Sequence, residues 1–287
     1  MIDIPMREYM YSLLKSMGFK PESDNLRFGL NNSKLKDIVT FSIPAGHSCP
    51  FAKDCRSCAT LKTERSNNTA ESKKYKFSGF GIQDGPHTQF RCFTAIDEVM
   101  RPGVRMARWR NFLTLLYTLS LGKNATVALI ERSLPPVKFG KPTRVHVAGD
   151  FFTQKYFDAW MEVARHNPDK RFYAYTKALP FWVKRLNKIP NNFKLTASYG
   201  GIRDWMILHY SLRFAKVVKS IDEAKQLGLE IDHDDSHAYN EGPSFALLVH
   251  GQQPAGSLFA KAWSALKKAG IGGYGKTKNK MKAAGTK

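Results

Sequence analysis

From about residue 143 onward, short apolar segments alternate with longer segments in which apolar residues recur every three or four positions. The short segments have the β-branched and aromatic composition of strands, and the longer ones have the spacing of amphipathic helices. The clearest helix covers residues 153–168, with Phe157, Trp160 and Met161 on one side. The predicted strands are residues 38–43, 144–149, 171–176, 194–199, 215–220 and 245–251.

This alternation predicts an α/β fold of six strand–helix units, in which the strands are parallel and helices form the crossovers. Such a sheet is either doubly wound and open, or curled into a complete or partial (βα) barrel. In both architectures ligands bind at the carboxyl ends of the strands, so the residues that follow each strand are the candidates for function.

The rest of the chain divides into a lead-in, an insertion and a tail. The predicted parts are residues 1–37 (N-terminal helix and lead-in), 38–270 (βα partial barrel with a cysteine loop at 49–58), 86–135 (helical insertion) and 271–287 (basic flexible tail). Within the insertion, Pro102 and Gly103 should separate two helices. Residues 60–85 show no helical or strand period and are expected to be a surface excursion.

The net charge indicates the kind of partner. The 287 residues include 45 lysines and arginines against 24 acidic residues, a formal charge of +21. Nucleic acid or a nucleotide is therefore the expected partner, although a solvated basic surface has the same composition. The arginines near the second inserted helix face either a phosphate backbone or solvent; they are Arg101, Arg105, Arg108 and Arg110. No apolar run approaches the length of a transmembrane helix, so no membrane partner is expected.

Three of the four cysteines, Cys49, Cys55 and Cys58, fall within ten residues, directly after the first predicted strand. The N-terminus has no pattern of a secretion signal, which favours metal ligation over disulfides. Zinc would take all four thiols, with Cys55 and Cys58 as a C-x2-C pair and Cys92 in the set. A four-iron four-sulfur cluster would take the three close cysteines, with its last iron left open or closed by Cys92 or His47.

Polar residues stand at the carboxyl ends of the later strands. They are Gly149 with Asp150, Thr176 with Lys177, Ser198 with Tyr199, Ser220, and His250 with Gln252. Because the thiol loop follows the first strand at the same end, these residues should converge on one cavity. Asp150 is expected to accept hydrogen bonds from an ammonium group or a ribose hydroxyl, or else to cap the next helix. Lys177 either holds an anionic group or extends into solvent.

Two other features have ordinary structural interpretations. His146 lies inside a predicted strand and is expected to be a core histidine. The segment 231–243 concentrates acidic residues and histidines, among them Asp232, His233, Asp234, Asp235 and His237. A divalent cation would suit such a segment, but a solvated acidic loop paired with nearby lysines is the favoured interpretation.

The sequence resembles the bacteriophage "gene product 88" family over most of its length. The stretches that carry the resemblance are FSIPAGHSCP, DGPHTQFRCF, HVAGDFFTQKYFDAWMEVA, RFYAYTKALPFWV, LTASYGG, IDHDDSHA and GPSFALLVHGQQPAGS. The resemblance implies a phage-encoded protein in the host cytoplasm, and it does not imply a particular activity.

The architecture and the order of motifs are also similar to those of radical S-adenosylmethionine proteins, which have a six-unit partial barrel. That resemblance implies a four-iron four-sulfur cluster on Cys49, Cys55 and Cys58. It also implies contacts of Gly149 and Asp150 with the methionine amino group and of Ser198 with the ribose. Two features depart from the family, because the spacing is C-x5-C-x2-C and the acidic motif is AGD. If Cys92 bound the fourth iron of the cluster, it would occupy the coordination position that S-adenosylmethionine needs.

The first functional hypothesis is an iron–sulfur protein that, with an open iron, acts as a radical enzyme on a nucleic acid or nucleotide. Asp150 and Lys177 are its candidate catalytic residues, and Gly149, Ser198 and His250 are further cofactor-binding candidates. The second hypothesis is a non-catalytic nucleic-acid-binding phage protein, associated with replication, with structural zinc or a closed cluster. A weaker third hypothesis is metal-assisted phosphoester hydrolysis at residues 233–237.

Overall fold

The computed structural model describes residues 4–30, 35–65, 75–136 and 142–271. It contains an eight-stranded sheet in the order β1-β2-β5-β6-β7-β8-β10-β9. The strands are β1 (Phe28–Gly29), β2 (Val39–Ser42), β5 (Pro142–Ala148), β6 (Arg171–Thr176), β7 (Phe193–Ser198), β8 (Phe214–Val218), β9 (Glu230–Ile231) and β10 (Phe245–Leu248). Within the described part of this sheet, only β1 pairs antiparallel to its neighbour.

The six strands predicted from the sequence are β2, β5, β6, β7, β8 and β10, and they lie side by side in chain order. The prediction of a parallel α/β sheet is therefore confirmed. A doubly wound sheet reverses its strand order in the middle, and this sheet does not. Strands β1 and β9 form its two edges and are not paired with each other, so the described strands form no closed barrel.

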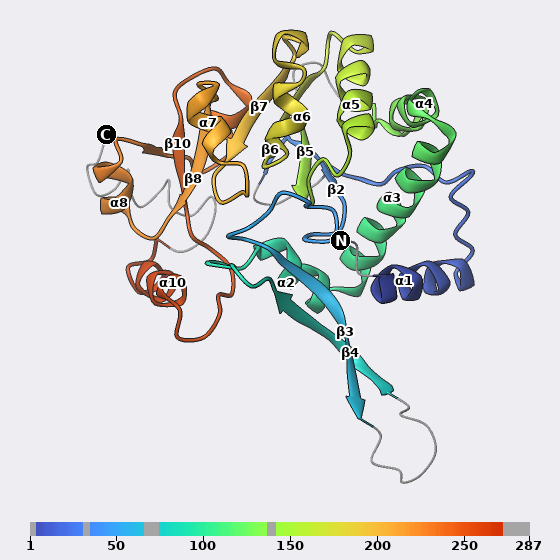
Figure 1. Ribbon diagram of the computed structural model, residues 1–287, viewed down its shortest axis with the longest axis horizontal. Helices are drawn as coiled ribbons and strands as arrows, with labels where there is room; N and C mark the ends of the chain where they lie inside the picture. The colour runs from blue at the N-terminus through green and yellow to red at the C-terminus, as the bar shows by residue number, and fades with distance from the viewer. Residues whose placement is uncertain (1–3, 31–34, 66–74, 137–141, 272–287) are drawn as a thin grey trace.

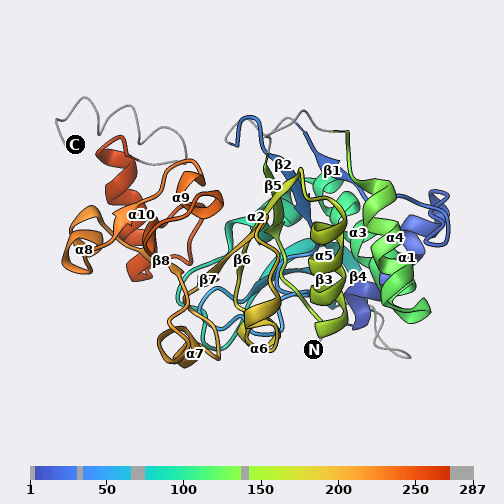
Figure 2. The same cartoon turned by 90° about the horizontal axis from the view of Figure 1, so that it is seen from above.

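Four long helices cover one face of the sheet (Figure 2). They are α1 (Ile4–Ser16), α3 (Pro102–Leu121), α4 (Lys123–Ser133) and α5 (Gln154–His166). The main core lies between these helices and the sheet, and it includes Trp109, Trp160 and Phe172, all fully buried. The apolar spacing seen in residues 153–168 thus identifies the buried face of α5 correctly.

The opposite face of the sheet has a smaller core of its own. Successive residues of a strand point to opposite faces. Phe172 and Ala174 of β6 accordingly belong to the main core, whereas Tyr173 belongs to the smaller one, against which Tyr175 packs. The helices that follow the later strands are α6 (Leu179–Val183), the 3-10 helix η1 (Leu186–Lys188), α7 (Trp205–His209), α8 (Ile221–Gln226), α9 (Ser236–Tyr239) and α10 (Leu258–Lys268).

Residues 60–85 form the surface excursion expected from the sequence, but the excursion has regular structure that was not expected. Strands β3 (Ser57–Arg65) and β4 (Tyr75–Asp84) pair antiparallel and project from the body of the protein (Figure 1). Leu61 and Phe80 pack against the main core. A register shift between Lys62 and Thr63 interrupts the two-residue period, so the strand pattern is not visible in the sequence. The basic tail proposed for residues 271–287 lies, apart from residue 271, outside the described residues.

The helical insertion breaks where the sequence predicts. Helix α2 (Phe93–Met100) ends one residue before Arg101, and α3 begins at Pro102. Proline suits the first helical position because its missing N–H would have no partner there. Gly122 separates α3 from α4 with a φ of 121°. None of the helices among the described residues is long and apolar enough to cross a membrane.

Two of the four arginines, Arg105 and Arg108, have neither of the roles predicted for them, whereas Arg101 is exposed to solvent. Arg108 is buried, and its Nη1 donates to the Glu98 carboxylate at 2.8 Å. Arg105 is also buried, donates to the Glu98 carbonyl, and lies 3.5 Å from the centre of the Phe80 ring. Arg110 pairs with Asp24 at 2.6 Å. Arg105 and Arg108 therefore stabilise the interior, and neither a phosphate backbone nor solvent surrounds them.

Candidate metal and ligand site

The loop between β2 and β3 brings thiols from two parts of the chain together. Cys49 and Cys55 lie in this loop, and Cys92 lies 34 residues beyond Cys58 at the start of α2. Burial raises the pKa of Cys49, and the nearby Asp150, Cys92 and Cys55 raise it further. Burial also raises the pKa of Cys55 to about 11; Lys177 lowers it, and Cys92 and Asp150 raise it.

Cys58 lies beside the same loop, at the start of β3, where it is opposite Gln83 of β4. It packs against Gly46, because a Cβ atom at position 46 would come within 2.7 Å of the Cys58 Cβ. The backbone of Gly46 in turn forms a hydrogen bond with Cys49 that lowers the pKa of that thiol. Cys58 thus adjoins the loop that carries Cys49 and Cys55, and Cys92 raises the pKa of both of those thiols.

Buried polar contacts fix the beginning of the loop. The Glu98 carboxylate accepts a hydrogen bond from the Ala45 amide at 2.8 Å. His47 Nε2 lies 2.8 Å from the Ala59 carbonyl, and its ring contacts Trp109. His47 is thus engaged in the structure of the loop. Glu98 is fully buried, and the pKa of its carboxyl group is raised by that burial despite the neighbouring Arg108.

The middle of the loop is held by the segment that follows β7. The carbonyl of Gly200 accepts hydrogen bonds from the amides of Lys53 and Asp54, at 3.0 and 2.9 Å. Gly200 has a φ of +95°, and a side chain there would press against Asp54. The glycine pair in the stretch SYGG is the signal of this contact in the sequence, and it does not identify Asp54 as the partner.

Cys92 is positioned from two sides. The Asp54 carbonyl accepts hydrogen bonds from the amides of Gln89 and Phe90, at 2.7 and 3.0 Å, just before Cys92. On the other side, Gln253 Oε1 accepts from the Arg91 amide at 2.8 Å. The end of β10 therefore meets the start of α2. The buried glutamine here is Gln253, not the Gln252 named from the sequence.

The predicted residue His250 also reaches this corner of the site. Its ring lies 4.5 Å from the ring of Phe93, the residue after Cys92. Gln253 Nε2 donates to the His250 carbonyl at 3.0 Å. His250 is thus close to the thiol region through α2.

Three hydrogen bonds fix the Asp150 carboxylate. Its Oδ1 accepts from the Phe151 amide at 2.7 Å and from the Thr176 hydroxyl at 2.6 Å. Its Oδ2 accepts from the Lys177 amide at 2.8 Å. Burial nevertheless raises the pKa of Asp150 to about 6, because three hydrogen bonds only partly replace water. The carboxylate does not cap α5, since Thr153 Oγ1 accepts from the Tyr156 amide there.

Lys177 extends from the end of β6 to the end of β7. Its ammonium group donates to Ser198 Oγ at 2.6 Å and to the carbonyls of Ser198 and Tyr199 at 3.2 and 2.8 Å. The side chain is buried and does not extend into solvent. The predicted residues Asp150, Lys177 and Ser198 therefore form one connected network beside the thiols.

Gly149 allows the cysteine loop to approach this network. Its φ is +86°, and a Cβ atom there would overlap Ile43 and lie 2.5 Å from Ser48 Oγ. Only glycine adopts this conformation without strain and leaves that space open. Gly149 therefore has a role in packing. This role is different from the cofactor contact that was predicted for Gly149 from the sequence.

The acidic segment after β9 belongs to a different part of the molecule. Asp235 is fully buried and accepts hydrogen bonds from Arg144 at 2.6 Å and from Tyr173 at 2.7 Å. Asp232 is also buried, and its Oδ1 lies 3.3 Å from His237 Nδ1. The favoured prediction of a solvated acidic loop is therefore wrong for both aspartates, which serve the smaller core.

His146 is buried as predicted, but it has an unusual backbone. Strand β5 bulges between the residues that pair with Thr40 and Ser42 of β2, and His146 lies in this bulge with a φ of +68°. Its Nε2 lies 2.9 Å from the Tyr156 hydroxyl, while its Nδ1 has no hydrogen-bond partner. Burial lowers the pKa of His146 to about 3, with a smaller contribution from Arg144.

The fold and this site define an α/β protein whose cysteine loop lies over the carboxyl edge of a parallel sheet. Comparison with known families gives a more specific result, because the profile of the Gene product 88 family matches residues 16–270. The chain therefore belongs to that family, and the matched region contains every site residue discussed above.

One curated protein matches the chain over a short stretch. The chain is 50% identical over 40 residues to the "Gene 88 protein" of Mycobacterium phage L5. That match covers 14% of this chain and 17% of the relative's length. The family and this relative support a bacteriophage origin for the protein. No solved structure matches the chain.

Proposed function

We propose that this phage protein is an iron–sulfur protein acting in the host cytoplasm, with a four-iron four-sulfur cluster held by its cysteine loop. The observation that carries the proposal is the grouping of Cys49, Cys55 and Cys92 beside Asp150. Buried thiols that raise one another's pKa are difficult to deprotonate. A bound metal cation stabilises their thiolate forms and so opposes the rise in pKa. Thiolates are the ligands of such clusters, so the donor set fits the group.

A cluster and a single zinc ion differ in how far apart they hold their thiolates. Thiolates around one zinc lie about 3.8 Å apart, because each Zn–S bond is about 2.3 Å. Among the described residues, no three His, Cys, Asp or Glu side chains are grouped to hold one metal ion. A cluster separates its thiolates further, since iron and sulfide atoms lie between them.

A radical S-adenosylmethionine enzyme is the finer form of this proposal, with a nucleic acid or nucleotide as substrate. Six parallel strands in chain order support it, as does the position of Asp150 after β5. With one iron left open, the site would supply one-electron reductive cleavage of S-adenosylmethionine. Asp150 Oδ2 accepts one hydrogen bond in the structure and has a second acceptor position for an ammonium group. Ser198 would contact a ribose only after releasing Lys177, because their hydrogen bond occupies its hydroxyl.

A non-catalytic nucleic-acid-binding protein is the second candidate. It is favoured by the position of Cys92, which lies among the loop thiols and is available as a fourth ligand. Four thiolates would close a cluster or hold zinc, and the centre would then be structural. The charge of +21 would in that case point to the function more directly than the metal does.

Anaerobic purification with iron, sulfide and zinc analysis tests these proposals. Wild type should contain about four irons and absorb as an iron–sulfur protein. His166→Gln is the matched control, because His166 is an exposed potential ligand on α5, paired with Glu131. Iron that persists in Cys92→Ala would support the open cluster, and iron lost from that variant would support the closed one. Stoichiometric zinc without iron would overturn the iron–sulfur proposal.

A further inference from the structure

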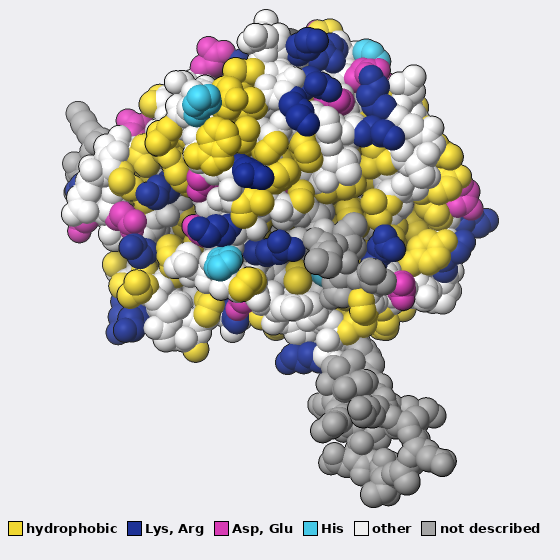
Figure 3. Space-filling model, viewed as in Figure 1, with side chains coloured by type: hydrophobic (Ala, Val, Ile, Leu, Met, Phe, Trp, Pro, Cys, Tyr) yellow, Lys and Arg dark blue, Asp and Glu magenta, His cyan; other side chains and the backbone are white. Residues whose placement is uncertain are grey.

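The segment after β7 exposes large apolar side chains next to the cysteine loop. Trp205 is 55% exposed and Leu208 is 73% exposed, both on α7, and Ile202 just before them is 49% exposed. Figure 3 shows hydrophobic side chains gathered over α7, with Lys and Arg side chains along the lower edge of this area. An exposed tryptophan in such a setting is typical of a binding surface.

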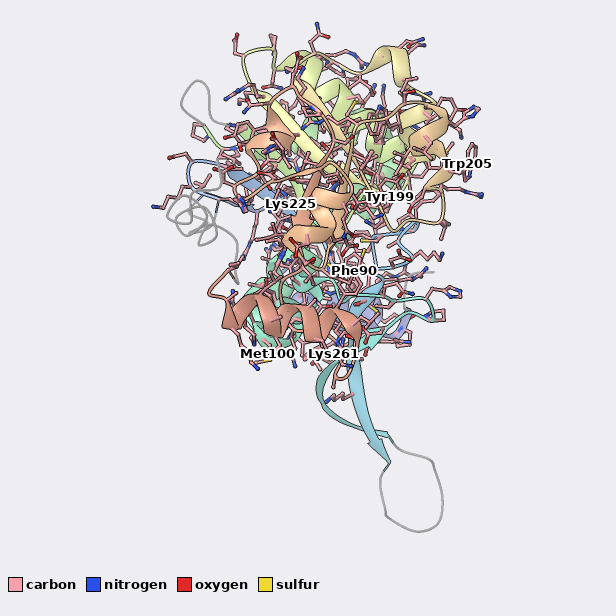
Figure 4. The ribbon with its side chains drawn as sticks, turned by 90° about the vertical axis from the view of Figure 1, so that its left-hand side faces the viewer. Phe90, Met100, Tyr199, Trp205, Lys225 and Lys261 are labelled. Carbon is pink, nitrogen blue, oxygen red and sulfur yellow. The ribbon has the colours of Figure 1, made fainter. Side chains whose placement is uncertain are left out.

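Cations accompany the aromatic residues of this segment. Lys216 Nζ lies 5.5 Å from the centre of the Tyr199 ring, and Arg203 is exposed between Tyr199 and Trp205 in the sequence. Lys53 of the cysteine loop is exposed as well. We call Lys53, Tyr199, Arg203, Trp205 and Lys216 the aromatic–basic strip. Figure 4 shows Tyr199 and Trp205 on the same face of the molecule.

Two acidic groups, Asp204 and Asp54, lie near this strip; burial raises the pKa of Tyr199 and the charge of Asp204 raises it further. Both oxygens of Asp204 accept hydrogen bonds, from the amides of Gly200 and Gly201 at 2.8 Å each. Asp54 also raises the pKa of Cys55, so it lies near the thiols as well. Lys53, Arg203 and Lys216 outnumber these two carboxylates, in a protein with a formal charge of +21.

Backbone contacts hold the strip rigidly at the edge of the thiol site. The Ile202 amide donates to the Phe51 carbonyl at 3.0 Å, and Ala52 forms an antiparallel bridge with Gly201. The Tyr199 carbonyl accepts from the Lys177 ammonium. Phe90, two residues before Cys92, lies on the same face as Tyr199 (Figure 4). A chain bound along the strip would thus pass beside the cysteines and the Asp150 network.

We propose that the aromatic–basic strip binds single-stranded nucleic acid, with an unpaired base stacked on Trp205. Exposed aromatic rings flanked by Lys and Arg form the stacking platforms of single-strand-binding proteins, whereas the bases of a duplex present no free face. The proposal deepens the proposed function, because it assigns the substrate class of the neighbouring site. Binding to the strip itself requires no cluster.

Fluorescence anisotropy with labelled 15-nucleotide probes tests the proposal. Wild type should bind single-stranded DNA or RNA more tightly than the duplex of the same sequence. Trp205→Ala should weaken single-strand binding at least fivefold, and Trp205→Phe should retain most of it. Arg203→Gln and Lys216→Gln should each lower the dependence of log affinity on log salt concentration by about one unit. The probe that binds with the higher affinity, DNA or RNA, identifies the nucleic acid that the strip prefers.

Tyr11→Ala is the matched control, because Tyr11 is 41% exposed and has Lys15 near its ring, but it lies on α1. It should bind as wild type does. Equal binding by Trp205→Ala and wild type, equal affinity for single strand and duplex, or no binding by wild type would each overturn the proposal. A Cys49→Ser and Cys55→Ser double variant that lacks iron should still bind. Metal content is measured separately, so the strip and the iron–sulfur site can fail independently.

Discussion

The backbone amide of Lys177 donates to the Asp150 carboxylate at 2.8 Å, while the ammonium group of the same lysine reaches the end of the next strand. The ends of β5, β6 and β7 are thereby connected through two side chains. Both carry a charge in a buried environment, so their bonding partners decide whether the carboxyl edge of the sheet is stable.

Removal of the Lys177 ammonium should destabilise this edge. Lys177→Met would leave the Ser198 hydroxyl and two partly buried carbonyls without their donor, at a cost of about 1–3 kcal/mol. Urea unfolding measures the change. Lys184→Met, at an exposed position after α6, should alter the free energy of unfolding by less than about 0.5 kcal/mol. Equal values for the two variants would contradict a supporting role for the Lys177 network.

Gly149→Ala should displace the cysteine loop. An alanine at a φ of +86° is strained, and its Cβ would overlap Ile43 and press against Ser48. We expect a loss of more than about 2 kcal/mol in the free energy of unfolding, from the backbone strain and the clash together. The bound iron per chain should fall as well, because Cys49 follows Ser48.

Gly103→Ala provides the control for that variant. Gly103 lies in the first turn of α3, and an added Cβ atom would meet nothing within 4 Å. Alanine is the better helix former, so Gly103→Ala should be neutral or stabilise the protein by up to about 1 kcal/mol. A Gly149→Ala protein with the same stability and iron content as Gly103→Ala would show that the close approach at Gly149 is unimportant.

The repeating units were predictable because their signal is local. The segment 171–176 is apolar on both faces, and it forms β6 with the predicted bounds. Pro102 similarly fixed the start of α3 through the geometry of its own ring. The position of the thiols and Asp150 at the same end of the sheet then followed from parallel topology alone.

Buried polar partners could not be predicted in this way. Arg105 and Arg108 have the composition of a basic surface, and only the three-dimensional position of Glu98 makes them interior residues. Asp235 is similar, because its partners Arg144 and Tyr173 come from strands 60 or more residues away. A sequence pattern records which residues are polar, but it does not record which of them meet.

Glu98 should be more important for stability than any exposed ion pair of the insertion. Glu98→Ala would leave the Arg108 guanidinium and the Ala45 amide without their buried acceptor, at a cost of about 3–5 kcal/mol. Glu98→Gln should cost less, because its amide oxygen can still accept hydrogen bonds. Arg101→Ala, which removes an exposed arginine 3.7 Å from Asp97, should change stability by less than about 1 kcal/mol. Thermal unfolding of the three variants would contradict this account if Glu98→Ala matched Arg101→Ala.

His146 should make the stability of the protein depend on pH. Its pKa is about 3 in the folded protein and about 6.5 when unfolded, so the unfolded chain binds a proton that the folded one does not. The stabilising effect is complete above pH 6.5 and is lost as the pH falls toward 3. At pH 5 the loss should be about 2 kcal/mol.

Two histidine variants test this prediction. His146→Gln lacks this titration, whereas His209→Gln, at an exposed position on α7, keeps it. Urea unfolding at pH 7.5 and pH 5 should therefore show a smaller loss for His146→Gln than for wild type and His209→Gln. Equal losses in all three proteins would mean that His146 is not held neutral by burial.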